Sequence, residues 1–209
     1  MDFLLFKRSF EKAELLPVYV VYGEEEFFIH EAVSLIRSRI LGKEETGVSL
    51  TEIGGAETSF PAVVEELETV PFFGTGGKRL VVVYGADKLV AHSRDKLQDY
   101  MESSSPFGYL VLVCNELDRR TSFFNKLNRK GGTVACRRIQ DAQLLSWITS
   151  RAQSYEKQIS LDACNILAEN VGNSLSLLAG HIEKLVVSVG RRREIRPEDV
   201  EGLVGAKQP

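Results

Sequence analysis

The chain has 209 residues, of which 44% are hydrophobic, so it is long enough for one large domain or two small ones with an ordinary globular core. Its 26 basic and 29 acidic residues give a formal net charge of −3, which excludes nucleic-acid binding driven by overall charge and leaves only a local or shared contact. No apolar run approaches the ~20 residues of a membrane span, and residues 1–17 lack the basic start and the cleavage site of an export signal, so we expect a cytoplasmic protein without membrane contact.

Expected strands alternate with expected helices through residue 140. The run Leu80–Val83 is continuously apolar, which is typical of a parallel sheet covered on both faces. The expected strands are Tyr19–Gly23, Val48–Ile53, Arg79–Tyr84, Tyr109–Cys114 and Thr133–Cys136. The helices between them repeat apolar residues at helical spacing and are expected after Gly23, after Thr58 or Ser59, after Ser93 and after Thr121. This alternation implies right-handed crossovers and predicts an α/β fold with a parallel sheet.

The strand signals stop after Asp141. Only helices are expected from there on, at Asp141–Tyr155, Ser160–Asn170, Asn173–Val189 and Pro197–Val204. The economical interpretation is two domains, an α/β domain at residues 1–140 and a small helical domain at residues 141–209.

The first expected strand runs into a helix at the place where a nucleotide-binding protein keeps its phosphate loop. Such a loop needs several glycines, a Lys that reaches the phosphates and a Ser or Thr for Mg²⁺. Here Glu24, Glu25 and Glu26 follow Gly23, and their charge suits a helix N-terminus while repelling a triphosphate. We therefore predict no nucleotide cofactor; the plain alternative is an ordinary turn with acidic residues in the first helical turn.

Neither the cysteines nor the histidines form a pattern typical of metal binding or catalysis. Cys114, Cys136 and Cys164 are widely spaced in apolar settings, which favours buried reduced thiols. The histidines lie far apart, on or beside helices, and are expected to be structural; they are His30, His92 and His181. No nucleophile elbow is present, so we predict neither a catalytic site nor a metal site.

Several segments, in order and spacing, resemble the delta subunit family of the bacterial DNA polymerase III clamp loader. They are PVYVVYGEEEFFIHEAV, LETVPFFGTGGKRLVVVYGADKL, YLVLVCNELDRR and the closing IRPEDVEGLV, within Pro17–Val204. The resemblance implies a P-loop-NTPase-like (AAA+-like) α/β domain with a vacant phosphate loop at residues 1–140, followed by a helical lid-like domain at residues 141–209. The family continues into a helical collar domain that assembles a pentamer, and this part is missing here.

The resemblance also implies a non-catalytic subunit that binds the sliding clamp and opens its ring for loading or unloading on DNA. The clamp-binding residues would be Val70, Pro71, Phe72 and Phe73, at an irregular tip that ends in glycines. Adjacent aromatics cannot both face inward on a strand, and buried aromatic anchors dominate many interfaces. An open alternative is that one of the two rings packs on the domain's own core.

The implied partners are the beta sliding clamp and, for the full-length protein, the gamma/tau and delta prime subunits, with DNA reached through the assembled complex. Without the collar, the fragment is expected to be a monomer. Active ATPase subunits of such loaders carry a Ser-Arg-Cys triplet after the fourth strand, whereas this chain has Asn115–Asp118 there. No arginine directed at a neighbour's nucleotide is therefore expected.

Two other function classes stay open at this point. One is an AAA+-type ATPase with a nucleotide site that the motifs do not reveal. The other is a nucleic-acid-binding module using the basic stretch at residues 119–138, for which a solvated face is the plainer interpretation; its basic residues are Arg119, Arg120, Lys126, Arg129, Lys130, Arg137 and Arg138. A second basic run, Arg191–Arg193, is expected in a loop after Gly190, partly complementing the preceding helix C-terminus.

Overall fold

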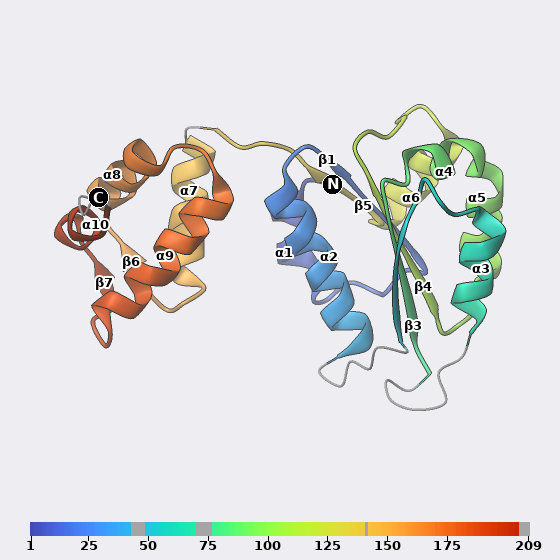
Figure 1. Cartoon of the computed structure of the whole chain (residues 1–209), viewed down its shortest axis with the longest axis horizontal. Coiled ribbons are helices and arrows are strands. Elements are labelled where there is room, and N and C mark those ends of the chain that lie inside the picture. Colours follow the sequence, from blue (N-terminus) through green and yellow to red (C-terminus); the bar gives the residue numbers. More distant parts are fainter. Residues whose placement is uncertain (43–48, 70–76, 141, 205–209) are drawn as a thin grey trace. The chain divides into compact units, whose positions relative to one another are not determined.

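The computed structural model describes residues 1–42, 49–69, 77–140 and 142–204. The chain divides into two compact units, Met1–Arg137 and Arg138–Pro209 (Figure 1). This division falls close to the domain boundary expected at Gln140. Among the described residues, no helix has both the length and the apolar character needed to cross a membrane.

The first unit is built on a five-stranded sheet in which every neighbouring pair is parallel. Its strand order is β2-β3-β4-β1-β5. The bounds are β1 Val18–Gly23, β2 Leu50–Gly54, β3 Arg79–Tyr84, β4 Gly108–Cys114 and β5 Thr133–Cys136. The predicted α/β fold with a parallel sheet is confirmed, and each expected strand has a counterpart close to its expected bounds. Of the strand expected at Val48–Ile53, Val48 is outside the described residues, Ser49 precedes β2, and β2 continues to Gly54.

Helices cover both faces of this sheet. The helices α1 (Phe3–Phe10) and α2 (Glu26–Leu41) lie on one face, and α3 (Phe60–Glu68), α4 (Asp87–His92), α5 (Arg94–Ser103) and α6 (Ser122–Lys130) lie on the other (Figure 1). Coverage of both faces explains why the strands are apolar at successive positions rather than at alternate ones. In β4, for example, Leu110, Val111 and Leu112 are all fully buried.

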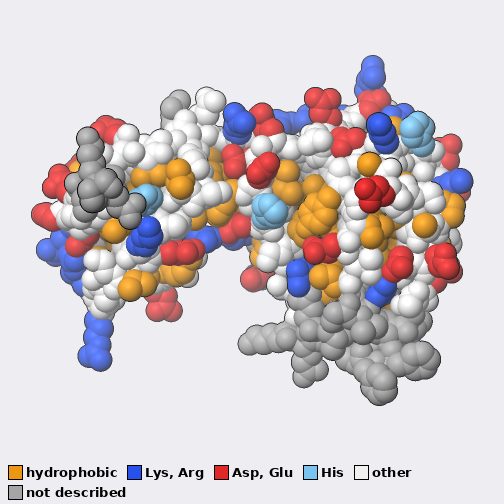
Figure 2. All heavy atoms as spheres, in the orientation of Figure 1, with side chains coloured by type: hydrophobic (Ala, Val, Ile, Leu, Met, Phe, Trp, Pro, Cys, Tyr) orange, Lys and Arg blue, Asp and Glu red, His pale blue; other side chains and the backbone are white. Residues whose placement is uncertain are grey.

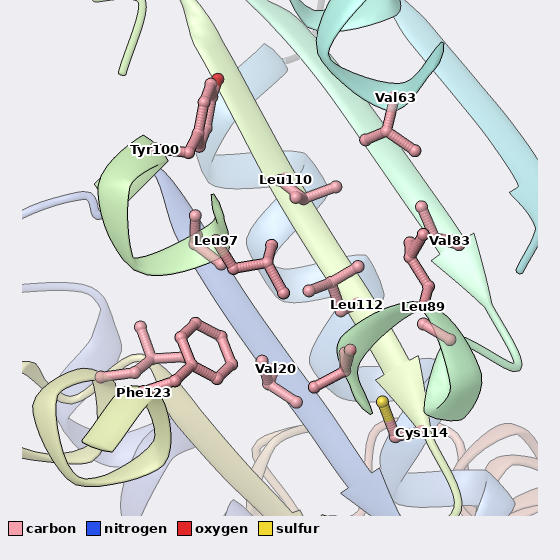
Figure 3. Close-up of a cluster of buried hydrophobic side chains, with 14 of the residues drawn as sticks. Val20, Val63, Val83, Leu89, Leu97, Tyr100, Leu110, Leu112, Cys114 and Phe123 are labelled. Atoms are coloured by element: carbon pink, nitrogen blue, oxygen red, sulfur yellow. The ribbon is translucent and has the colours of Figure 1, made fainter. Parts of the chain in front are cut away.

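The core under α3 to α6 is drawn in Figure 3. Val20, Leu110 and Leu112 from the strands meet Leu97 of α5 and Phe123 of α6 there. Capping residues fix where these helices begin: Thr121 Oγ1 accepts a hydrogen bond from Phe124 N at 3.2 Å, as expected for the cap of α6. Ser59 holds the same position before α3 but makes no such bond with its side chain.

The sequence did not predict α1 and α4. The buried residues of α1 are Phe3, Phe6 and Phe10, which follow helical spacing. The sequence therefore did contain a helix pattern here, in a segment that we had considered only as a possible export signal. The N-terminal amine donates to Thr133 O at 2.8 Å, and Ala135 N donates to Met1 O at 2.8 Å, which ties the N-terminus to β5. The six-residue helix α4 is too short to show a clear period.

The second unit is mainly helical, as expected. Its helices are α7 Ala142–Gln153, α8 Leu161–Val171, α9 Leu175–Val189 and α10 Pro197–Val204. The expectation that strands stop after Asp141 is wrong, because β6 (Gln158–Ile159) and β7 (Glu194–Ile195) form a small parallel sheet. Strands of two residues carry no readable alternation, so their pairing could not be anticipated.

Candidate functional site

The turn at the phosphate-loop position is short and closed by its own chain. Only Glu24 and Glu25 separate the end of β1 at Gly23 from the start of α2 at Glu26. Gly23 has φ 139°, and a Cβ placed on it would lie 2.1 Å from Cys136 O. The end of β1 therefore packs closely against the end of β5, and only glycine fits at position 23.

The backbone donors of this turn are engaged within the chain. Glu24 N and Glu25 N both donate to Cys136 O at 3.1 Å. The Glu25 carboxylate caps α2 by accepting from Phe27 N at 3.3 Å. A phosphate would need these amides and a nearby Lys, whereas it would meet carboxylates instead. The geometry of this turn therefore does not suit a nucleotide phosphate.

The three cysteines are buried free thiols, as the sequence predicted. Burial raises the pKa of the Cys114 and Cys136 thiols to about 12 and also raises that of Cys164. Such thiols are poor nucleophiles at neutral pH. Across residues 1–42, 49–69, 77–140 and 142–204, no group of three or more His, Cys, Asp or Glu side chains is placed to hold a metal ion.

The predicted clamp-binding residues Val70, Pro71, Phe72 and Phe73 lie outside the described residues. The structure does describe both ends of that segment, at Thr69 after α3 and at Gly77 before β3.

A buried arginine joins the helix and the strand that flank the segment. Arg79 is only 7% exposed; its Nε donates to Glu66 O at 3.0 Å, and its guanidinium forms an ion pair with the Glu66 carboxylate. Arg79 Nη2 also donates to Thr51 Oγ1 at 2.7 Å, and that hydroxyl donates to Glu66 Oε2 at 3.2 Å. The last turn of α3 is thus tied to β2 and to the first residue of β3.

Phe107 is an exposed aromatic residue at the same edge of the sheet. Its side chain is 44% exposed, and its carbonyl oxygen accepts from Arg79 N at 2.8 Å. Sequence reasoning missed it as a surface residue, although Ser103–Pro106 before it and Gly108 after it form a turn-like setting that could have suggested exposure. An exposed phenylalanine therefore lies beside the described ends of the predicted clamp-binding segment.

Known proteins resemble this chain in both sequence and fold. The model of the family "DNA polymerase III, delta subunit" matches residues 19–137. The chain belongs to this family. It is 28% identical over 207 residues to DNA polymerase III subunit delta of Bacillus subtilis (strain 168), covering 94% of this chain and 59% of the relative. The resemblance inferred from the sequence motifs is confirmed.

A solved structure agrees with this delta-family assignment. The fold is similar to that of the Bacillus subtilis DNA clamp loader delta protein (YqeN), with a TM-score of 0.81 and 26% sequence identity. The match covers 97% of this chain and 62% of that one. The chain therefore spans roughly three fifths of the length of these delta-family relatives.

The segment after the fourth strand of this delta-family chain is held by carboxylates. Asp87 Oδ1 accepts from Asn115 N and from Glu116 N, both at 3.0 Å. Asp118 accepts from Arg120 Nε at 3.1 Å and lies 4.0 Å from Arg94. Hydrogen bonds from Arg120 lower the pKa of the Asp118 carboxyl. Arg120, close to this position, is thus engaged within its own chain.

The basic stretch at residues 119–138 is partly neutralised in the delta-family fold. Arg120 is bound to Asp118 as above, and Lys126 forms an ion pair with Glu102. Arg119 lies over the ring of Tyr22, 5.8 Å from its centroid. This pairing weakens the interpretation of the stretch as one free cationic surface.

Proposed function

We propose that this chain is the clamp-contacting part of a clamp loader delta subunit, which binds the sliding clamp and favours the open form of its ring without binding nucleotide itself. The observation that carries the proposal is the match to delta-family proteins along nearly the whole chain. The closed turn at Glu24 and Glu25 supports the absence of a nucleotide role. In an assembled clamp loader, the gamma/tau and delta prime subunits would be further partners, and DNA would be met in that complex.

The proposed mechanism uses binding energy alone. Phe72 and Phe73 insert into an apolar pocket of the ring-shaped clamp, where burying each ring contributes roughly 1.5–3 kcal/mol. Arg79 ties α3 to β2 and β3, so the elements that flank the segment are already joined before the clamp binds, and ordering them costs no entropy on binding. A ligand shifts the closed–open equilibrium of a ring only by its differential affinity for the two states, so clamp binding and clamp opening are coupled.

Replacing both rings tests the clamp contact. The variant Phe72→Ala/Phe73→Ala is expected to lose on the order of 10³-fold in clamp affinity, because aromatic anchors in pockets dominate such interfaces. Surface plasmon resonance with the immobilised clamp measures the loss, and the thermal unfolding midpoint should hardly change. Leu177→Ala, which removes an apolar side chain 59% exposed on α9, is the control and should bind like wild type. A folded double variant that still binds and unloads the clamp normally would remove these rings from the mechanism.

Calorimetry tests the nucleotide part of the proposal. Titration of ATP with Mg²⁺ should release no binding heat, because the amides of the turn are engaged and its side chains are acidic. Binding in the micromolar range would show that the chain is instead an ATPase-type subunit with an unrecognised site.

A further inference from the structure

The second unit carries a basic hollow that the clamp contact does not use. It has a volume of about 840 Å³ and lies between the turn that joins α7 to β6 and the turn that joins α9 to β7. The first turn contributes Tyr155, Lys157 and Gln158, and the second contributes Arg191 and Arg193. In Figure 2, Lys and Arg side chains gather at this end of the unit, where the α9–β7 connection lies in Figure 1.

Arg191 and Arg193, the two arginines of the hollow, are free to bind an anion. Both are exposed, and neither forms an ion pair with any carboxylate in the described part of the chain. The acidic side chains close to them in sequence or in the fold already have partners: Asp199 binds Arg192, Glu194 binds Arg196, and Glu183 binds Arg151. Glu156 is the carboxylate on the wall of the hollow, against three cationic side chains.

The backbone of the hollow is fixed by hydrogen bonds. Lys157 Nζ donates to Gly190 O at 2.5 Å and to Arg192 O at 2.8 Å. These bonds join the two turns and offset the negative end of α9, which would otherwise repel an anion. The sequence led us to expect that the Arg191–Arg193 run, in a loop after Gly190, partly complements the C-terminus of α9, and Lys157 contributes positive charge to the same helix end. Gln158 N donates to Arg193 O at 2.9 Å, so the arginine turn is held in place by the β6–β7 pairing.

We propose that this hollow binds phosphate groups of a DNA backbone. Unpaired guanidinium groups on a fixed frame suit phosphate oxygens, which they can bind in a bidentate manner. The side chains that line the hollow are mainly polar, which suits a string of phosphates better than an apolar protein segment. The inference goes beyond clamp binding, since that contact needs no residue of this unit, and it relies on the proposed function only in choosing DNA as the polyanion.

Charge reversal at the two arginines tests the site in the whole 209-residue chain. Fluorescence anisotropy with a labelled DNA duplex at low salt should show binding by wild type. Arg191→Glu/Arg193→Glu should weaken it about tenfold or more and reduce the slope of log K against log salt by about two, since two phosphate contacts are lost. The matched control, Arg8→Glu/Lys12→Glu, changes the net charge equally at exposed residues of the first unit and should bind nearly as wild type.

Every other result counts against the site. It is overturned if wild type does not bind the duplex, if the control loses as much affinity as the test variant, or if Arg129→Glu/Lys130→Glu abolishes binding while the test variant keeps it. Arg191→Gln/Arg193→Gln repeats the test with less disturbance should the reversal variant unfold. Clamp affinity, measured without DNA, should be unchanged in all folded variants, so a failure of this site is distinct from a failure of clamp binding.

Discussion

At the scale of single residues, Glu156 has an unusual backbone conformation. Its φ is 59°, and among the described residues no other non-glycine residue has a positive φ. It ends α7 in a Schellman motif, in which Lys157 N donates to Ala152 O at 3.1 Å and Glu156 N to Gln153 O at 2.9 Å. A side chain in this left-handed region costs roughly 1 kcal/mol that glycine avoids.

Two substitutions at Glu156 separate its backbone strain from its charge. Glu156→Gly should stabilise the second unit by about 0.5–1 kcal/mol, because strain is relieved. Glu156→Gln should leave stability nearly unchanged, because the strain remains. Both remove a carboxylate from the wall of the basic hollow, so both should bind the DNA duplex more tightly. Thermal unfolding and anisotropy measure the two effects; a Gln variant that is stabilised as much as the Gly variant would contradict the strain argument.

At the scale of elements, Arg79 joins α3, β2 and β3. Arg79→Met should cost about 1–3 kcal/mol of unfolding free energy, because the bonds to Glu66 and Thr51 are lost while the half-exposed Glu66 carboxylate regains water. Glu66→Gln, which leaves the bond from Arg79 Nε to the Glu66 backbone carbonyl intact, should cost less. Urea unfolding measures both. Equal losses in the two variants would mean that the ion pair itself, rather than the buried arginine, holds this edge together.

The sequence predicted those elements whose signal lies within the element. Strands β3 and β5 are bounded as expected because buried parallel strands are unbroken apolar runs. The turn between β1 and α2 was equally predictable, since its position depends on which residue types follow Gly23. The β6–β7 pairing was not predictable, because it depends on contacts between Gln158 and Glu194, far apart in the chain. The basic hollow was missed for the same reason, since it forms only where Lys157 meets the turn after α9.

At the scale of the whole molecule, each unit buries a core of its own. The first unit packs its parallel sheet between two layers of helices. In the second, Leu144 and Ile148 of α7, Leu167 of α8 and Ile182 of α9 are buried together with Val200 of α10. The second unit is the smaller of the two, and a smaller unit buries a lower fraction of its surface, so it is expected to be the less stable one.

The single tryptophan makes this difference measurable in the intact chain. Trp147 lies on α7 and is buried, so its fluorescence reports on the second unit alone, whereas far-ultraviolet circular dichroism reports on both. If the units unfold independently, the fluorescence transition in urea should come at lower denaturant than the main dichroism transition, because non-coincident probes indicate more than one cooperative step. Glu156→Gly should move the fluorescence transition to higher urea and leave the later dichroism step in place. Arg79→Met should instead move the later dichroism step to lower urea and leave the fluorescence transition in place. A single transition, coincident for both probes and shifted as a whole by either variant, would instead show that the two units unfold as one cooperative body.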